Sequence, residues 1–160
     1  MKPKAEMVSF FFRIFIGGIF IVAGLSKIAD PIGFYSTLMG FRVLPDFLLH
    51  FMAVYLPWLE LLLGLSVLLG LFHTTAALML AGINIAFAAA IVSVILRGID
   101  IDCGCFGLFT DILHIPDKAD WTAVVRDMIF TGMSYFIFHA KVSAYSLEDY
   151  LRKRGGNAIS

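Results

Sequence analysis

The sequence predicts an all-α integral membrane protein built as a four-helix bundle. Hydrophobic residues make up 60% of the 160 residues, charged residues only 15%, and the mean hydropathy is +0.90. A typical soluble domain is about 45–50% apolar and about 25% charged. Four apolar stretches approach the roughly 20 residues that a helix needs to cross a bilayer, and open strands cannot satisfy their backbone in lipid. The length fits one domain, and the zero net charge suggests no nucleic-acid partner.

The four predicted spans cover about residues 7–29, 48–72, 74–96 and 121–141. Lys2 and Lys4 precede the first span, as in a secretory signal peptide. That span is long, contains Arg13 and lacks a clear small-x-small cleavage site, so we expect a retained helix. The third span has a small-residue face that is suited to close helix contact, formed by Ala77, Ala81, Asn84 and Ala88.

The Lys and Arg residues in the flanks predict that both termini lie in the cytoplasm. Residues 1–141 would form the membrane domain, and residues 142–160 a polar cytoplasmic tail. The two longer connections would then face outward. The first, between Pro31 and Pro45, is expected to hold a short interfacial helix, and the second, residues 97–120, contains the cysteines. We therefore expect a multi-pass protein of the bacterial inner membrane whose cysteine loop faces the periplasm.

The second connection contains the stretch "RGIDIDCGCFG", with both cysteines of the chain, Cys103 and Cys105. A disulfide needs Cα atoms about 4.4–6.8 Å apart, so the chain must fold back between them. Gly104 lowers the cost of that bend. A disulfide across one residue closes almost no loop and is a poor staple, whereas strained, exposed disulfides are the labile or catalytic ones. An oxidising outer compartment would let the disulfide persist.

Two other interpretations of the cysteine pair remain open. The cysteines can be small hydrophobic residues whose proximity is accidental. They can also bind a metal together with His50 and His114, which are predicted on the same side of the membrane. Structural zinc sites usually have two to four residues between paired cysteines, so the Cys-Gly-Cys spacing disfavours metal. We predict no metal site, and redox use of the pair is the favoured interpretation.

Charged residues inside the predicted spans are also candidates for function. Glu60 lies near the middle of the second span, and Arg126 and Asp127 lie in the fourth. A charge in the bilayer costs at least about 2.5–3.5 kcal/mol, so it usually faces a partner or a wet cavity. One interpretation is a structural ion pair between Glu60 and Arg126. The other places Glu60 in a cavity beneath the cysteine loop, where it would move protons or hydrogen-bond a quinone.

Arginine and aspartate residues near the cysteines would have opposite effects on them. Arg97 or Arg126 would lower the pKa of a nearby thiol and raise its thiolate fraction. Asp100 and Asp102 would oppose that effect. The sequence does not decide which effect dominates.

Three motifs resemble the MauE branch of the DoxX-like membrane proteins: "GLSKIADPIGF" (24–34), "LPWLELLLGL" (56–65) and "RGIDIDCGCFG" (97–107). The resemblance covers about residues 8–140 and implies a four-helix membrane protein linked to thiol–disulfide chemistry. MauE-like proteins are associated with maturation of methylamine dehydrogenase, alongside a thioredoxin-like partner. DoxX-like relatives are linked to quinone-coupled sulfur oxidation. By position, Cys103 and Cys105 would be the redox pair, with Glu60 and Lys27 as polar positions.

The sequence therefore predicts a thiol–disulfide oxidoreductase that exchanges disulfides with a periplasmic thioredoxin-like or disulfide-containing protein, with quinone as a candidate electron carrier. Cys103 and Cys105 would carry the chemistry, and the expected supporting residues are Glu60, Lys27, Arg97, Arg126, Asp102 and Gly104. One alternative is a transporter that handles a metal ion or a small sulfur species, because thiolates suit soft cargo. The other is a non-catalytic assembly factor for a periplasmic redox enzyme.

Overall fold

The computed structural model describes residues 2–43, 45–104 and 118–140, and these ranges are predominantly α-helical. Their only strand-like pairing is an isolated bridge between Asp102 and Lys118. Cys105, His114 and the predicted tail, residues 142–160, lie outside the described residues. The prediction of an all-α protein is confirmed for the described ranges. Their helices are α1 (Lys2–Ala29), α2 (Pro31–Phe41), α3 (Asp46–Leu69), α4 (His73–Leu96) and α6 (Trp121–Ala140).

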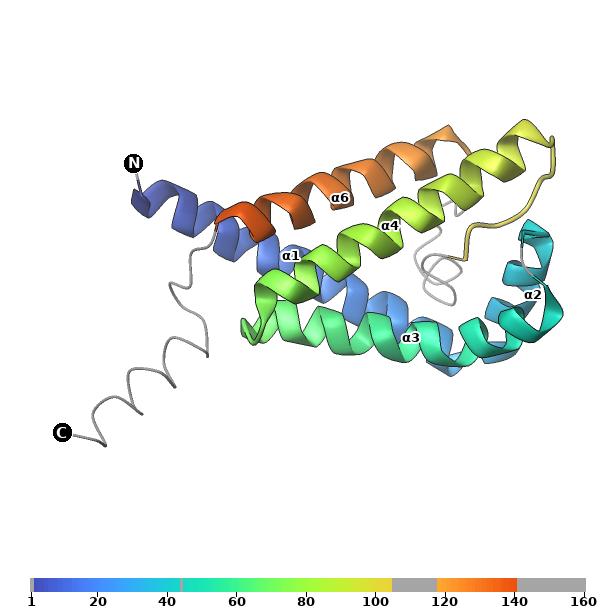
Figure 1. Cartoon of the computed structure of the whole chain (residues 1–160), viewed down its shortest axis with the longest axis horizontal. Helices are drawn as coiled ribbons and strands as arrows, with labels where there is room; N and C mark the ends of the chain where they lie inside the picture. Colours follow the sequence, from blue (N-terminus) through green and yellow to red (C-terminus); the bar gives the residue numbers. More distant parts are fainter. Residues whose placement is uncertain (1, 44, 105–117, 141–160) are drawn as a thin grey trace.

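The four long helices pack against one another in two pairs. Helix α1 packs along α3 and α4 along α6, and the pairs meet where α3 contacts α4 and α1 contacts α6. Figure 1 shows the start of α1 and the turn between α3 and α4 at one end of the molecule. Helix α2, the end of α4 and the start of α6 lie at the opposite end. We call this opposite end, with residues 97–104 and 118–120, the α2 end.

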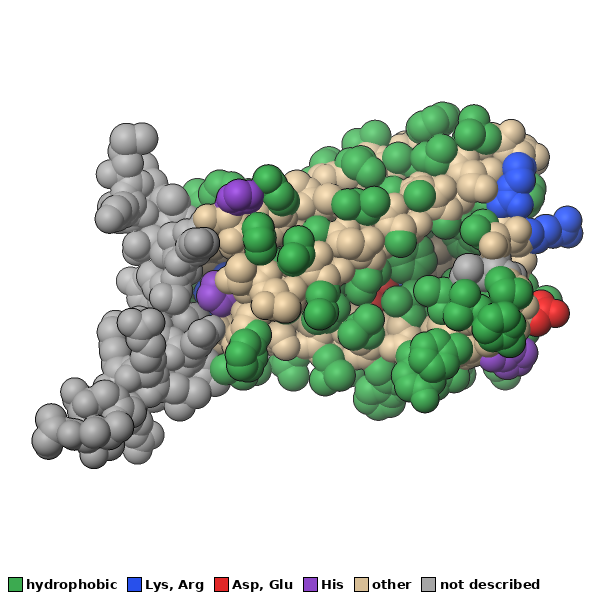
Figure 2. Space-filling view, in the orientation of Figure 1, with side chains coloured by type: hydrophobic (Ala, Val, Ile, Leu, Met, Phe, Trp, Pro, Cys, Tyr) green, Lys and Arg blue, Asp and Glu red, His purple; other side chains and the backbone are tan. Residues whose placement is uncertain are grey.

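Three of these helices are long and apolar enough to cross a membrane: α1 over Met7–Ala29, α3 and α4. They correspond to the first three predicted spans. Helix α6 is not among them, so the structure does not bear out the fourth span as a membrane crossing; this helix contains Arg126, Asp127 and His139. Figure 2 shows hydrophobic side chains over the flanks of the helices and charged side chains at the α2 end. These features fit a multi-pass membrane protein.

Helices α1 and α3 approach so closely that glycine is needed at the contact. A Cβ added to Gly17 would lie 2.9 Å from the carbonyl oxygen of Gly64, and one added to Gly24 would lie 2.9 Å from that of Pro57. The two contacts are seven residues apart on each helix, so they define one antiparallel register. Arg13 is buried and donates from Nε to the carbonyl oxygen of Val67 at 3.1 Å, near the end of α3.

The predicted small-residue face of the third span is confirmed. Ala77, Ala81, Asn84 and Ala88 are all buried in α4. The predicted end of the second span at residue 72 is wrong by three residues. Helix α3 ends at Leu69 because Gly70 adopts the left-handed conformation, with φ +73°, and its N–H closes the last turn on the Ser66 and Val67 carbonyls.

A helix is present in the first long connection, as predicted between Pro31 and Pro45. Asp30 caps the start of α2, because its Oδ1 accepts from the Gly33 N–H at 2.9 Å, and Pro31 occupies the first helical position. Phe34, Leu38 and Phe41 form the buried face of α2. This face packs near the start of α3 and places Phe41 beside the cysteine loop.

Candidate functional site

Cys103 lies buried at the α2 end, where the second long connection turns back toward α6. Its exposed fraction is 1%, and it belongs to an apolar cluster with Phe41, Ile91, Val94 and Ala123. These four residues come from α2, α4 and α6, so three helices enclose the sulfur. Cys103 is disulfide-bonded. Cys105, the chain's other cysteine, lies outside the described residues.

The two ends of the cysteine connection are held together at its base. The Ala119 N–H donates to the Ile101 carbonyl oxygen at 2.9 Å, and Asp102 and Lys118 form the isolated bridge. Asp102 itself is exposed. Because the base is pinned beside the start of α6, Cys103 is positioned next to the first turns of that helix.

Gly104 has the backbone conformation that the tight bend was expected to require. Its φ is +64°, in the left-handed region that L-residues with side chains rarely adopt. A Cβ at this position would also lie 2.8 Å from Cγ2 of Thr37 on α2. Both the backbone and the neighbouring helix therefore require glycine next to Cys103.

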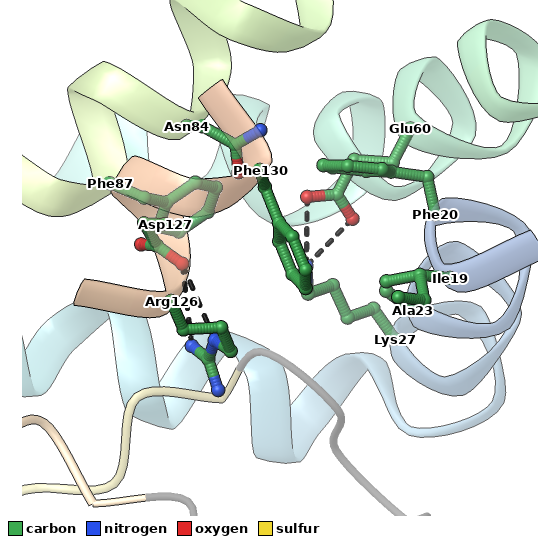
Figure 3. Close-up of a pocket in the computed structure, with 10 residues that line it drawn as sticks. All are labelled: Ile19, Phe20, Ala23, Lys27, Glu60, Asn84, Phe87, Arg126, Asp127 and Phe130. Atoms are coloured by element: carbon green, nitrogen blue, oxygen red, sulfur yellow. Dashed lines mark hydrogen bonds and ion pairs between the residues drawn. The ribbon is translucent and has the colours of Figure 1, made fainter. Parts of the chain in front are cut away.

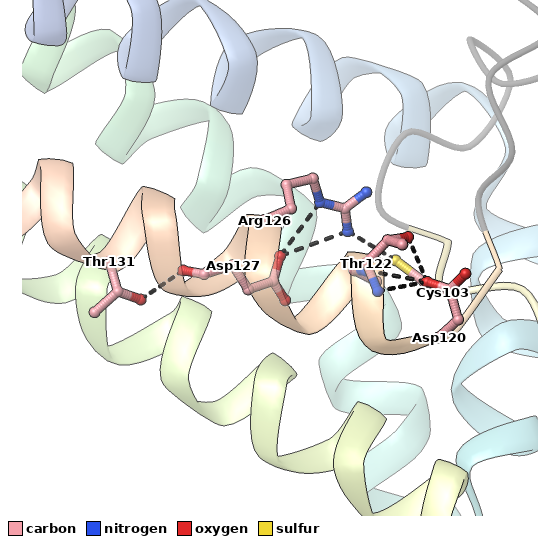
Figure 4. A network of polar contacts seen from close by, with 7 residues as sticks. Cys103, Asp120, Thr122, Arg126, Asp127 and Thr131 are labelled. Carbon is pink, nitrogen blue, oxygen red and sulfur yellow. Dashed lines mark hydrogen bonds and ion pairs between the residues drawn. The ribbon is translucent and has the colours of Figure 1, made fainter.

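Arg126 links the sulfur of Cys103 to an acidic partner on α6 (Figure 4). Its Nη2 donates to Sγ of Cys103 at 3.2 Å. Its Nε and Nη2 lie 3.4 and 3.5 Å from Oδ1 of Asp127, which is buried. Thr131 donates to the Asp127 backbone oxygen at 2.8 Å, one turn further along the helix. The guanidinium is thus held against the sulfur. Of the two arginines expected near a cysteine, Arg97 and Arg126, it is Arg126 that makes this contact.

Arg97, the other arginine expected near the cysteines, contacts backbone carbonyls instead. Its Nε donates to the Ser93 carbonyl oxygen at 3.0 Å, one turn back in α4. Its terminal nitrogens donate to the carbonyl oxygens of Phe41 and Arg42 at the end of α2. These carbonyls have no partner within a helix, so Arg97 closes the end of α2 and ties it to α4.

Glu60 is paired with Lys27, so the one of the two interpretations that paired it with Arg126 is wrong. Lys27 Nζ lies 2.8 Å from Oε1 and 2.6 Å from Oε2 of Glu60, and both side chains are buried. The Lys27 ammonium also lies 5.2 Å from the ring centre of Phe34 and 5.3 Å from that of Phe87. Two aromatic faces and one carboxylate therefore enclose this cation.

The direction of side chains on antiparallel helices explains this pairing. Side chains on an α-helix lean toward its N-terminus. Lys27 therefore leans back toward Gly24 on α1, and Glu60 leans back toward Pro57 on α3. Gly24 and Pro57 lie at the same level in the α1–α3 register, so the two charged groups meet there.

A small, partly open cavity lies between the two acid–base pairs (Figure 3). It has a volume of about 30 Å³ and is bordered by α1, α3, α4 and α6, with Phe130 projecting between the pairs. This volume accommodates roughly one or two water molecules. Buried Asn84 also lines it, and its Nδ2 has no hydrogen-bond partner among the described residues. Glu60 thus borders a polar cavity that reaches the Arg126–Asp127 pair.

A larger apolar cavity of about 250 Å³ lies between α2, α3 and α4. Phe41 and Ala90 line this cavity and also pack in the cluster around Cys103. Phe87 borders both this cavity and the small polar one. Phe41 therefore belongs both to the wall of the apolar cavity and to the cluster around Cys103.

The described residues contain no group of three or more His, Cys, Asp or Glu side chains arranged for a metal ion. His50, one of the two histidines of the metal alternative, lies on α3 within 3.4 Å of the Tyr35 hydroxyl and 3.1 Å of the Asp46 carbonyl oxygen. Cys105 and His114 lie outside the described ranges, so the structure does not test the full donor set.

Asp120 caps the helix that carries Arg126. Its Oδ1 accepts from the Thr122 hydroxyl at 2.5 Å and from the N–H groups of Thr122 and Ala123 at 2.9 and 3.1 Å. The hydroxyl of Thr122, followed by the Ala123 N–H, lowers the pKa of the Asp120 carboxyl below its ordinary value. The ionised cap also suits the positive end of the helix dipole.

Sequence reasoning identified most of the charged groups but not all of their relations. It did not assign Asn84 to a polar cavity, because a small polar residue among alanines looks like a packing position. It also did not pair Asp127 with Arg126 as the group that holds the guanidinium. The sequence did contain a signal for that pair. Two adjacent opposite charges in an apolar span cost free energy unless each one faces a partner or a wet cavity.

Comparison with known proteins shows the family of this chain. The family described as "Methylamine utilisation protein MauE" matches residues 5–140. The methylamine utilization protein MauE of Paracoccus denitrificans is 34% identical over 132 residues, which are 82% of this chain and 68% of that protein. Its counterpart in Methylophilus methylotrophus is 29% identical over 147 residues, 90% of this chain and 75% of that protein. No solved structure matches significantly. The chain therefore belongs to the MauE family.

Proposed function

We propose that this chain is an accessory membrane protein of methylamine utilisation that exchanges disulfides through Cys103 and Cys105. The observation that carries the proposal is the disulfide-bonded Cys103 with the Arg126 guanidinium 3.2 Å from its sulfur. A positive charge beside a sulfur stabilises the thiolate that forms when a disulfide is reduced. The names of the MauE relatives supply the metabolic context.

The proposed membrane arrangement is a bundle of α1, α3, α4 and α6 in the bacterial inner membrane, with both termini in the cytoplasm. The α2 end then faces the periplasm, where disulfides persist, and α2 lies at the membrane interface. Helix α6 crosses with its charged pair turned toward the small cavity between the helices, which lowers the cost of burying Arg126 and Asp127. The proposed partner is a periplasmic thioredoxin-like or disulfide-containing protein. Placement among the wider DoxX-like proteins is part of the same proposal.

Quinone is the proposed oxidant of the reduced cysteine pair. The apolar cavity of about 250 Å³ shares Phe41 with the Cys103 cluster, and its apolar walls fit a quinone ring and the start of its tail. A quinone held there would supply an acceptor for the two electrons and two protons that the dithiol gives up as the disulfide closes. Glu60 and Lys27 line the polar cavity next to Arg126, and we assign them to holding and moving protons there.

The test uses the full chain in membranes of a Paracoccus denitrificans strain that lacks its own MauE. The redox state of the cysteines is followed by thiol alkylation in the absence of oxygen. A reduced thioredoxin-like protein is expected to reduce the pair, and a short-chain quinone is expected to reoxidise it. The double variant Cys103→Ser/Cys105→Ser should lose growth on methylamine, whereas the control His50→Gln should retain it.

Each alternative function predicts a different result in this experiment. A transporter for metal or sulfur species would carry bound metal in stoichiometric amount and would have thiols that resist alkylation. A non-catalytic assembly factor would support full growth as the double serine variant. Either result would reject the exchange function.

A further inference from the structure

We propose that Cys103 is the sulfur that leaves as a thiolate during exchange, so that the mixed disulfide with a partner protein forms on Cys105. The inference rests on the proposed function and assigns a role to each of the two cysteines. It is carried by the burial of Cys103 and by its contact with Arg126.

Access is the first argument. In thiol–disulfide exchange a thiolate attacks one sulfur of the disulfide, and access decides which sulfur is attacked. Cys103 is 1% exposed and packs against Phe41, Ile91, Val94 and Ala123. A thiolate carried by a folded partner would have to displace side chains of three helices to reach it. Because the chain has only two cysteines, attack falls on the other sulfur.

Leaving-group stability is the second argument. A sulfur departs faster when its thiolate is stabilised. Nη2 of Arg126 lies 3.2 Å from Sγ of Cys103, so the negative charge would form beside a guanidinium that is already in place. Oδ1 of Asp127 accepts from Nε and from the same Nη2 at 3.4 and 3.5 Å, so it helps to hold that guanidinium in place. Access and charge thus favour the same direction of cleavage.

The reaction balances without any further reagent. The partner thiolate forms a bond to the Cys105 sulfur, the Cys103–Cys105 bond breaks, and its electron pair stays on Cys103 as a thiolate. The partner's second cysteine, as a thiolate, then attacks the sulfur of the partner's first cysteine in the mixed disulfide. This attack releases Cys105. The partner dithiol is oxidised to a disulfide, the chain's disulfide is reduced to a dithiol, and the two protons pass from the partner thiols to the cysteines.

The experiment uses the unaltered full chain in detergent and a thioredoxin-like protein that retains only its attacking cysteine. The partner thiolate reacts with the intact disulfide, N-ethylmaleimide blocks the thiol that is released, and peptide mass spectrometry locates both modifications. We expect the partner on Cys105 and the maleimide on Cys103. The reverse distribution, or an equal mixture, would overturn the assignment. Formation of no adduct would overturn the proposed exchange function itself, and the assignment with it.

A pair of arginine variants tests the role of the charge. Arg126→Gln should slow formation of the adduct by roughly tenfold or more, since the guanidinium stabilises the departing thiolate. Arg42→Gln is the matched control, because Arg42 lies at the same end of the molecule and its side chain is exposed. Its rate should stay within about twofold of the unaltered chain. Equal slowing in both variants would overturn the role of Arg126 in departure of the thiolate.

Discussion

The two acid–base pairs beside the polar cavity differ in whether the cation keeps a hydrogen-bond donor for a third group. Lys27 and Glu60 join two helices at 2.6 and 2.8 Å, and both side chains are almost completely buried. Arg126 and Asp127 are neighbours on one helix at 3.4 and 3.5 Å, and the Arg126 side chain is 23% exposed. A guanidinium has five N–H donors, so Arg126 can hold Asp127 and still contact Cys103.

This difference separates an ion pair whose loss should act first on stability from a charge that directly contacts the reacting sulfur. Burial in an apolar helix does not distinguish them, since Glu60 and Asp127 are equally hidden. The distinguishing feature is a spare donor beside a reactive atom. Breaking the first pair should mainly reduce stability, and disturbing the second should mainly reduce the rate of exchange.

The largest effect is expected from Glu60→Ala. Removing one partner of a buried ion pair leaves an uncompensated charge and typically costs about 3–5 kcal/mol. The free energy of unfolding is measured by titrating the purified chain with sodium dodecyl sulfate in mixed micelles. The double variant Lys27→Met/Glu60→Leu removes both charges and should recover most of the loss. The single variants Lys27→Met and Glu60→Leu complete the comparison, and a double variant as unstable as their two losses added together would show that the pair is not coupled.

The next effect is expected at the close contact that brings Lys27 level with Glu60. Gly24→Ala places a methyl group 2.9 Å from the Pro57 carbonyl oxygen and should cost about 1–3 kcal/mol as α1 and α3 are forced apart. Gly18→Ala is the matched control on the same helix, because nothing lies within 4 Å of its added Cβ. The same titration should find this control unchanged or more stable by up to about 1 kcal/mol. Similar losses in both variants would contradict the close approach.

A smaller effect on stability, but a clear effect on exchange, is expected from Gly104→Ala. The left-handed backbone alone costs an L-residue roughly 1–2 kcal/mol. Gly98 has nearly the same φ, +65°, but nothing lies within 4 Å of its added Cβ, whereas the one at Gly104 meets Thr37 at 2.8 Å. Gly98→Ala should therefore exchange disulfides normally, and Gly104→Ala should exchange more slowly because Cys103 shifts from Arg126. Equal exchange rates in the two variants would show that the Thr37 contact does not position the sulfur.

The fold was largely readable from the sequence because hydropathy reports directly on long apolar helices. The first three spans and the helix after Asp30 were predicted near their observed positions. The end of α3 was missed because an apolar stretch continues past Gly70, and only the backbone conformation there ends the helix. Helix α6 is a weaker case, since Arg126 and Asp127 dilute its apolar character.

The site was only half readable, because pairing depends on helix register. The sequence placed Glu60 and Arg126 among the candidates, but the choice of partner followed from the contacts of Gly17 and Gly24 with α3. Hydropathy carries no information about that register. The roles of Arg97 and Arg126 were likewise indistinguishable, since both are arginines near the cysteine connection, and only the observed contacts separate them.

The smallest expected effect concerns the cap of the helix that carries Arg126. Its hydrogen bonds from Thr122 and Ala123 lower the pKa of Asp120 in the folded chain, so the ionised cap stabilises the fold at all pH values above the ordinary pKa. That contribution is lost as the pH falls below about 4 and through the lower folded pKa. Asp120→Asn keeps a capping oxygen but does not titrate. The variant should therefore lose less stability than the unaltered chain between about pH 6 and about pH 3.

The comparison is made as a difference in the same unfolding titration, since other carboxyl groups titrate in both proteins over this range. Asp102→Asn is the control, because Asp102 is exposed in the same connection and its bridge to Lys118 runs through the backbone. A loss that is equal in Asp120→Asn and the unaltered chain would mean that the cap does not depend on its charge. If the cap holds α6 in place, the contact between Arg126 and Cys103 should weaken over the same low pH range, and exchange should slow there in the unaltered chain more than in Asp120→Asn.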